Sequence, residues 1–94
     1  MVNHIVTWIV KEENKEASCK KIKEMLEALP AMIPELKFLQ VGINENGEAY
    51  DLILLTRFDS YDDWKTYDVH PEHQKVRAFV KTVTESRVVV DFTE

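Results

Sequence analysis

Several residue types are scarce in this chain of 94 residues, which has one cysteine, two glycines and three prolines. The lone Cys19 cannot form an intramolecular disulfide, and it has no C-x-x-C partner for redox or metal chemistry. We expect it to be a small, partly buried hydrophobic residue rather than a reactive thiol. Gly42 and Gly47 lie too far apart to form a glycine-rich phosphate loop, so we expect no cofactor.

Long apolar runs and positive charge are scarce as well. No stretch approaches the roughly 18 apolar residues that a membrane-spanning helix needs. Twelve basic against 17 acidic residues give a formal charge of −5. Lys and Arg supply most of the affinity for nucleic-acid phosphates and for anionic membranes, so we expect neither as a partner. The opening residues, Met1 to His4, lack a basic signal-peptide region, and we therefore expect a cytoplasmic protein.

Hydrophobic spacing predicts four strands within one domain that covers residues 1–94. β-branched and aromatic residues gather in four short runs, and polar segments separate these runs. Asn46 and Gly47 lie between the second and third runs, which indicates a hairpin turn. The predicted strands cover residues 5–10, 36–43, 50–58 and 87–92.

Two helical segments are predicted between these strands. In the first, apolar residues recur at the i, i+3, i+4, i+7 spacing of an amphipathic helix, which ends before Pro30. The second begins at Ser60, the expected N-cap, and is broken at Pro71, which is favoured at a helix start. The resulting order of elements is that of an α+β, ferredoxin-like split βαβ fold. Its four-stranded antiparallel sheet should have the first and third strands in the centre.

Both faces of the predicted sheet are apolar. Residues 5–10, 52–55 and 88–90 are apolar at successive positions, although neighbouring residues in a strand point to opposite faces. Two helices cover only one face, and monomers rarely leave a large apolar patch in water. We therefore expect a homodimer that forms through the open face of the sheet. The alternative is that both faces are merely less polar than average and that a loop covers one of them.

Five segments together resemble the stress-responsive A/B-barrel (Dabb) family. The resemblance covers essentially the whole chain, and its most specific part is the His-Pro-x-His element. It implies a dimeric α/β barrel, in which two ferredoxin-like sheets close around a shared core. The segments are Val2-Asn3-His4-Ile5-Val6, Leu29-Pro30 with Ile33-Pro34, Tyr50-Asp51-Leu52, Tyr67-Asp68-Val69-His70-Pro71-Glu72-His73 and Val88-Val89-Val90-Asp91-Phe92.

The resemblance implies no single activity. Many members of the family have no assigned reaction, and some plant members are linked to stress and form larger oligomers. One plant branch is a polyketide cyclase that uses aldol chemistry in a pocket between the sheet and the helices. His73 and Tyr67 stand at the positions of its catalytic histidine and tyrosine, and His4 matches a further pocket histidine. The chain differs at another pocket histidine, where it offers Leu52.

The predicted site combines a catalytic pair with residues that line a pocket. His73 falls in the first turn of a helix, where the helix dipole disfavours the imidazolium and keeps the ring neutral. A neutral imidazole beside the Tyr67 phenol can act as a general base with an oxyanion donor. His4, Trp8 and His70 are expected to line the pocket. The alternative is that the two C-terminal histidines only cap or pack, and that Tyr67 is a core residue.

A metal site is not expected. His70 and His73 have the i, i+3 spacing of two ligands on one helix, and Asp68 and Glu72 are near them in sequence. However, Pro71 places His70 outside the helix, and no compact third ligand is evident.

Three functions stay open at this point. The leading hypothesis is a homodimer with a small, mainly apolar pocket in each subunit that performs cofactor-free proton transfer on a small carbonyl compound. The second is a non-catalytic, stress-associated protein that acts through its own assembly. The third is a cofactor-free monooxygenase of the same barrel fold. The sequence does not decide whether the protein is an enzyme.

Overall fold

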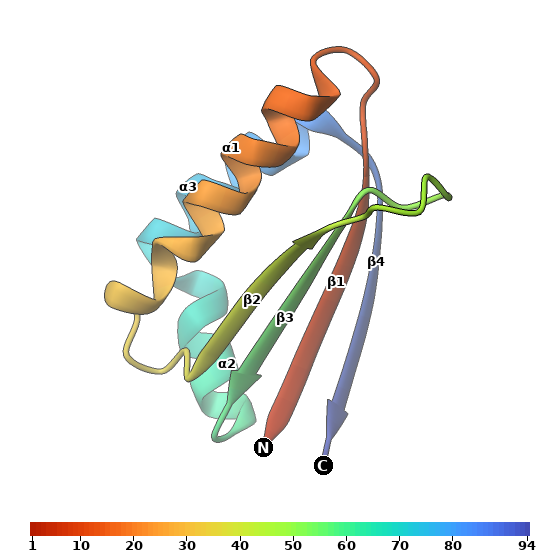
Figure 1. Cartoon of the computed structure of the whole chain (residues 1–94). Coiled ribbons are helices and arrows are strands. Elements are labelled where there is room, and N and C mark those ends of the chain that lie inside the picture. The colour runs from red at the N-terminus through yellow and green to blue at the C-terminus, as the bar shows by residue number, and fades with distance from the viewer.

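The computed structural model describes residues 1–94. It contains a four-stranded antiparallel sheet with helices on one of its faces (Figure 1). The strands lie side by side in the order β2-β3-β1-β4. The first and third strands are therefore central, and the predicted ferredoxin-like α+β fold is confirmed. In chain order the elements are β1 (Val2–Val10), α1 (Lys15–Glu27), a 3₁₀ turn (Leu29–Ala31), β2 (Phe38–Ile43), β3 (Leu52–Phe58), α2 (Tyr61–Val69), α3 (Pro71–Val83) and β4 (Thr84–Thr93).

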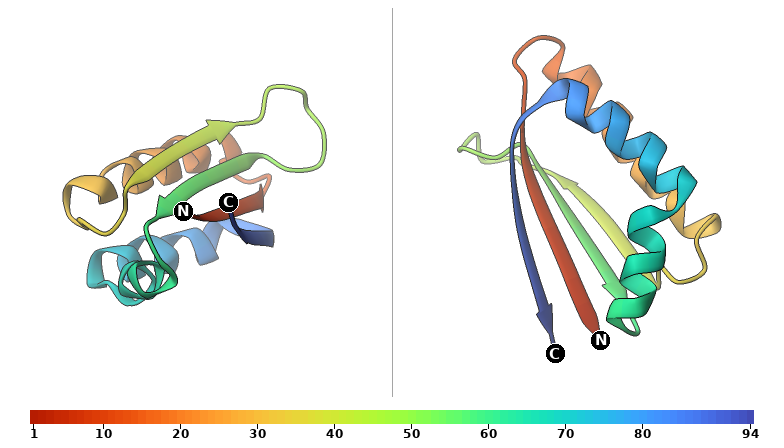
Figure 2. Two further views of the ribbon diagram at one scale, coloured as in Figure 1. Left: turned by 90° about the horizontal axis from the view of Figure 1, so that it is seen from below. Right: turned by 180° about the vertical axis from the view of Figure 1, so that it is seen from behind.

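Strand alternation divides the sheet into a helix-covered face and an open face. On the covered face, Trp8 of β1 pairs with Leu52 of β3, and Val6 pairs with Leu54; all four are buried. Seen from behind, α1, α2 and α3 lie on one side of the sheet and leave the other side bare (Figure 2). The covered face therefore belongs to the core, and a site between sheet and helices lies on this side.

Local sequence explains where α2 and α3 begin. Ser60 caps α2, because its hydroxyl accepts a hydrogen bond from the backbone N–H of Asp63 at 3.2 Å. His70 has an extended backbone, and Pro71 then occupies the start of α3, where its missing N–H costs nothing. This break lets the end of α2 and the beginning of α3 meet at an angle.

Some boundaries differ from the predicted ones. β1 begins at Val2 rather than Ile5, since Val2 already pairs with Phe58 on one side and Thr93 on the other. The partner strand β4 is correspondingly longer than predicted. β2 and β3 are shorter, and the connection between them spans residues 44–51. Within it, Gly47 has a φ of 75°, a left-handed conformation that glycine adopts without strain.

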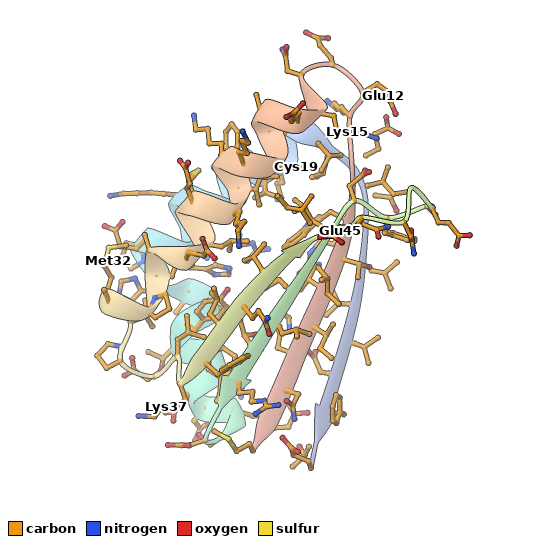
Figure 3. All side chains as sticks on the ribbon, viewed as in Figure 1. Glu12, Lys15, Cys19, Met32, Lys37 and Glu45 are labelled. Carbon is orange, nitrogen blue, oxygen red and sulfur yellow. The ribbon has the colours of Figure 1, made fainter.

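The buried core lies between the covered face and the helices. Ile22 of α1, Leu29 and Ile33 of the following connection, and Phe58 of β3 have no exposed surface. Cys19 is buried on the side of α1 that faces the sheet (Figure 3), and burial raises the pKa of its thiol. The prediction of a packed rather than a reactive cysteine agrees with this environment.

The open face carries apolar side chains on all four strands. Several are more than a third exposed, and Val90 is 54% exposed. Such a patch is unusual on the surface of a monomer. We call the following apolar residues the open face of the sheet: Ile5, Ile9, Phe38, Ile53, Leu55, Val88, Val90 and Phe92. None of the helices is both long and apolar enough to cross a bilayer.

Candidate functional site

A cavity of about 110 Å³ lies between the covered face of the sheet, α2 and α3. We call it the His73 cavity. Its walls are apolar where the strands and α3 face each other, and polar where α2, α3 and β4 meet. Four of the five predicted site residues, His4, Trp8, Tyr67 and His73, contribute to it. Its lining consists of these four with Val6, Leu26, Leu54, Asp68, Val76, Arg77, Val80, Lys81, Thr84 and Arg87.

Tyr67 and His73 form a stacked pair at this cavity. Tyr67 lies near the end of α2 and His73 in the first turn of α3. The interruption between the two helices at Pro71 therefore brings the two rings together. Their centroids are 4.1 Å apart and their planes are inclined by 27°. Phe58 packs against Tyr67 from the sheet at a centroid distance of 5.1 Å. The phenol and the imidazole therefore pack directly against each other, with Phe58 on the sheet side of Tyr67.

The hydrogen bond of His73 defines its tautomer. Its Nδ1 lies 3.0 Å from the backbone carbonyl oxygen of Asp68, and a carbonyl only accepts, so Nδ1 carries the hydrogen. Burial lowers the pKa of His73, and Arg77 acts in the same direction, while the bond to the Asp68 carbonyl opposes them. The neutral ring is therefore favoured. Desolvation is the largest cause, whereas the prediction from the sequence rested on the helix dipole. Nε2 is left as an unprotonated acceptor.

The lowered pKa of His73 predicts a loss of stability in mild acid. The unfolded chain takes up a proton near the ordinary histidine pKa of 6.5, whereas the folded state does so only at lower pH. The free energy of unfolding should therefore fall as the pH drops below 6.5, and the loss should level off below the folded pKa. Urea unfolding from about pH 7.5 to about pH 5 measures this. The His73→Gln variant should lose less stability than the wild type; parallel losses would contradict the prediction.

Tyr67 contributes a hydroxyl that lacks a partner within the protein. The residue is 1% exposed, and its phenolic oxygen is buried without a hydrogen bond. Burial, together with the carboxylate of Asp68, raises the pKa of Tyr67, so the phenol keeps its hydrogen. Leaving a buried hydroxyl unpaired costs free energy, and such groups in native proteins call for an explanation. A ligand oxygen that accepts this hydrogen would remove the cost.

A second histidine approaches from the sheet. His4 is buried on β1, and its Nδ1 donates to Oδ1 of Asp91 on the neighbouring strand β4 at 2.5 Å. Its ring lies 5.7 Å from that of Trp64 on α2. Asp91 contacts only Nδ1, so it orients the imidazole ring of His4 and does not occupy Nε2. Sequence reasoning missed Asp91, although its position in β4 opposite His4 follows once the two strands are paired.

His70 does not join the predicted site, and its assignment to the pocket is corrected. Its ring Nδ1 accepts a hydrogen bond from the backbone N–H of Glu72 at 3.1 Å, so it caps α3. With the extended backbone before Pro71, the His70 side chain contacts the first turn of α3 and does not line the cavity. Trp8, in contrast, is a buried wall of the cavity and leaves it open.

Basic residues on α3 and β4 also line the cavity, and sequence reasoning missed them. Arg77 lies one turn after His73, and its Nη1 is 3.3 Å from Oδ1 of Asp68. Lys81 follows one turn later, and Arg87 reaches the cavity from β4. Residues 73, 77 and 81 are spaced i, i+4, i+8, so they share one face of a helix. This spacing could have revealed Arg77 and Lys81 from the sequence.

The chain offers no metal centre of the usual kind in this region. No group of three or more His, Cys, Asp or Glu residues lies close enough together to hold a metal ion. Asp68 pairs with Arg77 instead, and its backbone carbonyl accepts the hydrogen bond of His73.

Fold and site together define a ferredoxin-like α+β protein with a histidine–tyrosine cavity between sheet and helices. The chain belongs to the Dabb family, because the model of the stress responsive A/B barrel domain matches residues 2–94. No curated protein matches the chain.

Several solved structures have a similar fold. A dimeric protein of unknown function and ferredoxin-like fold from Bacteroides fragilis is 38% identical; the match covers 97% of this chain and 93% of that one, with a TM-score of 0.90. A dimeric ferredoxin-like protein of unknown function from Thermobifida fusca is 27% identical over 99% and 90% of the two chains, with a TM-score of 0.88. The hydroxynitrile lyase from Passiflora edulis is 18% identical over 97% and 90%, with a TM-score of 0.85, and shares the fold.

Proposed function

We propose that the protein is a homodimer in which each His73 cavity binds a small carbonyl compound and transfers a proton without a cofactor. His73 is the general base, and Tyr67 is the hydrogen-bond donor to the carbonyl oxygen. The observation that carries this proposal is the stacked pair itself. It combines an imidazole with a free Nε2 and a buried phenol without a partner at one cavity.

The proposed step needs only these two side chains. Nε2 of His73 removes a proton from the carbon next to the carbonyl group. The electron pair of the broken C–H bond forms a C=C bond, and the π electrons of the carbonyl group move onto its oxygen. The phenol of Tyr67 donates to the resulting enolate oxygen, where a buried donor stabilises developing charge most strongly. Return of the proton from His73, to the same carbon or after a new bond has formed, restores the enzyme.

Supporting residues keep the base ready. The carbonyl of Asp68 holds the hydrogen on Nδ1 of His73, and the lowered pKa keeps the ring neutral near pH 7. A base with a pKa close to or below the working pH is unprotonated and available. His4, fixed by Asp91, offers a second imidazole at the same cavity.

The open face of the sheet is the proposed dimer interface. Its exposed apolar side chains would be covered by the same face of a second copy. The similar proteins from Bacteroides fragilis and Thermobifida fusca are dimeric, which supports the homodimer itself. A dimer built in this way leaves the helix-covered face, and with it the His73 cavity, within each subunit.

Deuterium exchange tests the proposal without a known substrate. Small ketones, aldehydes and oxo acids are incubated with the protein in D₂O near neutral pH, and loss of the proton signal beside the carbonyl is followed by NMR. At least one compound should exchange faster than in buffer alone. If the whole panel exchanges at the buffer rate, the proton-transfer proposal fails and the assembly hypothesis gains. Oxygen consumption with an electron-rich quinol would instead favour the monooxygenase.

A further inference from the structure

Basic residues concentrate at the His73 cavity although the chain as a whole is acidic. Three of the 12 Lys and Arg residues, Arg77, Lys81 and Arg87, line it, and Asp68 is the one carboxylate among the lining residues. Asp68 is already paired with Arg77 at 3.3 Å. Lys81 and Arg87 take part in none of the ion pairs of the chain. The cavity therefore carries positive charge that the protein does not neutralise.

These cations have a defined order along the cavity. His73, Arg77 and Lys81 follow one another at intervals of four residues, so they share one stripe of α3. The stripe runs from the buried His73 through the half-buried Arg77 to the exposed Lys81. Arg87 pairs in register with Trp8 and stands on the same, covered side of the sheet. The cations thus form a rim, and the histidine–tyrosine pair forms the interior.

The space between rim and interior is small and apolar. Val6, Trp8 and Leu54 of the sheet face Val76 and Val80 of α3 across it. An apolar cavity of roughly 150 Å³ accepts a benzene molecule. At about 110 Å³ this cavity is smaller, so its apolar part takes a body no larger than a benzene ring. The unpartnered phenol of Tyr67 independently calls for a hydrogen-bond acceptor on the occupant.

We propose that the cavity binds a small organic carboxylate, with its anionic group at Arg87, Lys81 and Arg77 and its apolar body at the Trp8 wall. Guanidinium groups match the geometry of a carboxylate, and an ammonium adds a further donor. The carbonyl part of the assignment rests on the proposed function: a carbonyl at Tyr67 and His73 makes the substrate a small oxo acid. The carboxylate part stands on the rim alone.

Titration with a matched pair of probes tests this assignment. Benzoate and its neutral analogue benzamide are compared by isothermal titration calorimetry and by tryptophan fluorescence, which Trp8 at the cavity wall makes sensitive to binding. The wild-type protein should bind benzoate at least about tenfold more tightly than benzamide, since hydrogen bonds to charged groups contribute more than neutral ones. Added salt should weaken benzoate binding and leave benzamide binding unchanged.

Two double variants separate the rim from overall charge. Lys81→Gln with Arg87→Gln should weaken benzoate binding by about tenfold or more and leave benzamide unchanged. Lys20→Gln with Lys37→Gln changes net charge equally but on exposed side chains elsewhere; Lys37 lies next to β2, at the opposite edge of the sheet (Figure 3). This control should bind benzoate like the wild type. Circular dichroism establishes that each variant is folded.

The outcomes distinguish the carboxylate site from the proposed reaction. Benzoate binding that depends on Lys81 and Arg87 supports the carboxylate site even if no carbonyl compound exchanges deuterium. Equal binding of benzoate and benzamide, unchanged affinity in the rim variant, or no saturable benzoate binding overturns it. Exchange of neutral ketones at the rate of oxo acids would leave the proton-transfer proposal intact and would contradict the assignment of an oxo acid as the substrate.

Discussion

Replacing Val90 with aspartate should convert the protein from a dimer into a monomer. Val90 lies on the open face of the sheet, opposite Ile5 of β1, and is 54% exposed in the single chain. In the proposed dimer this position is covered by the second copy, so the substitution places two carboxylates in an apolar interface. Burying an unpaired charge costs several kcal/mol (about 3–5 for an uncompensated one). This cost is a large fraction of the association free energy of a dimer with a micromolar Kd, which is about 8 kcal/mol.

Light scattering after size-exclusion chromatography measures the expected change in mass. Val69→Asp is the matched control, because Val69 is 68% exposed at the end of α2, away from the open face. The control should remain a dimer. A folded Val90→Asp protein that runs as a dimer would contradict the proposed interface, and a monomeric wild type would remove the dimer proposal altogether.

The second large effect is expected at His73. Glutamine at this position has a similar size and can still donate to the carbonyl of Asp68, but it offers no basic nitrogen to the cavity. A general base contributes about 10²- to 10⁴-fold to a rate. We therefore expect His73→Gln to reduce deuterium exchange by this factor, measured on whichever carbonyl compound the wild type exchanges. Because the His73 ring is uncharged at neutral pH, its replacement by glutamine removes no charge, and the variant should still fold.

Tyr67→Phe completes this test. The phenylalanine ring keeps the stacking on His73 and the packing on Phe58, and it removes a hydroxyl that has no partner in the protein. Stability should therefore stay equal or rise, while exchange falls by about 10²- to 10³-fold through loss of the oxyanion donor. This combination separates a catalytic hydroxyl from a structural one.

His70→Asn is the control for both substitutions. His70 caps α3 outside the cavity, and asparagine is a favoured N-cap residue. Its exchange rate should match the wild type. Undiminished exchange in His73→Gln, or an equal loss in His70→Asn, would contradict the assigned roles.

The fold could be predicted from the sequence because its signals are local and repeated. Apolar runs gave the strands, the stripe of Ile22 and Leu26 gave α1, and Pro71 gave the division between α2 and α3. Pairing between strands is not local, so the boundaries were less accurate. Val2 belongs to β1 because it has partners in β3 and β4, and no feature of its own sequence indicates this.

Most of the predicted site residues came from the family resemblance. Tyr67 and His73 are six residues apart, and the intervening proline indicates that two helices meet there. From the last strand, Arg87 reaches the cavity and Asp91 reaches His4, and both contacts depend on which face of β4 meets the helices. A shift of one residue in register would turn both away. At His70 the error was to place the residue in the pocket, whereas the stated alternative of a helix cap is what the structure shows.

Nitrogen NMR of the histidine rings tests the central claim most directly, namely that His73 offers an unprotonated Nε2 to the cavity. Long-range ¹H–¹⁵N spectra of labelled protein near neutral pH report the tautomer and charge of each histidine, and His73→Gln assigns the signal. We predict that His73 is neutral and carries its hydrogen on Nδ1, and that the Nε2 signal shifts when a cavity probe such as benzoate is added. A charged ring, or a hydrogen on Nε2, would contradict this account of the site.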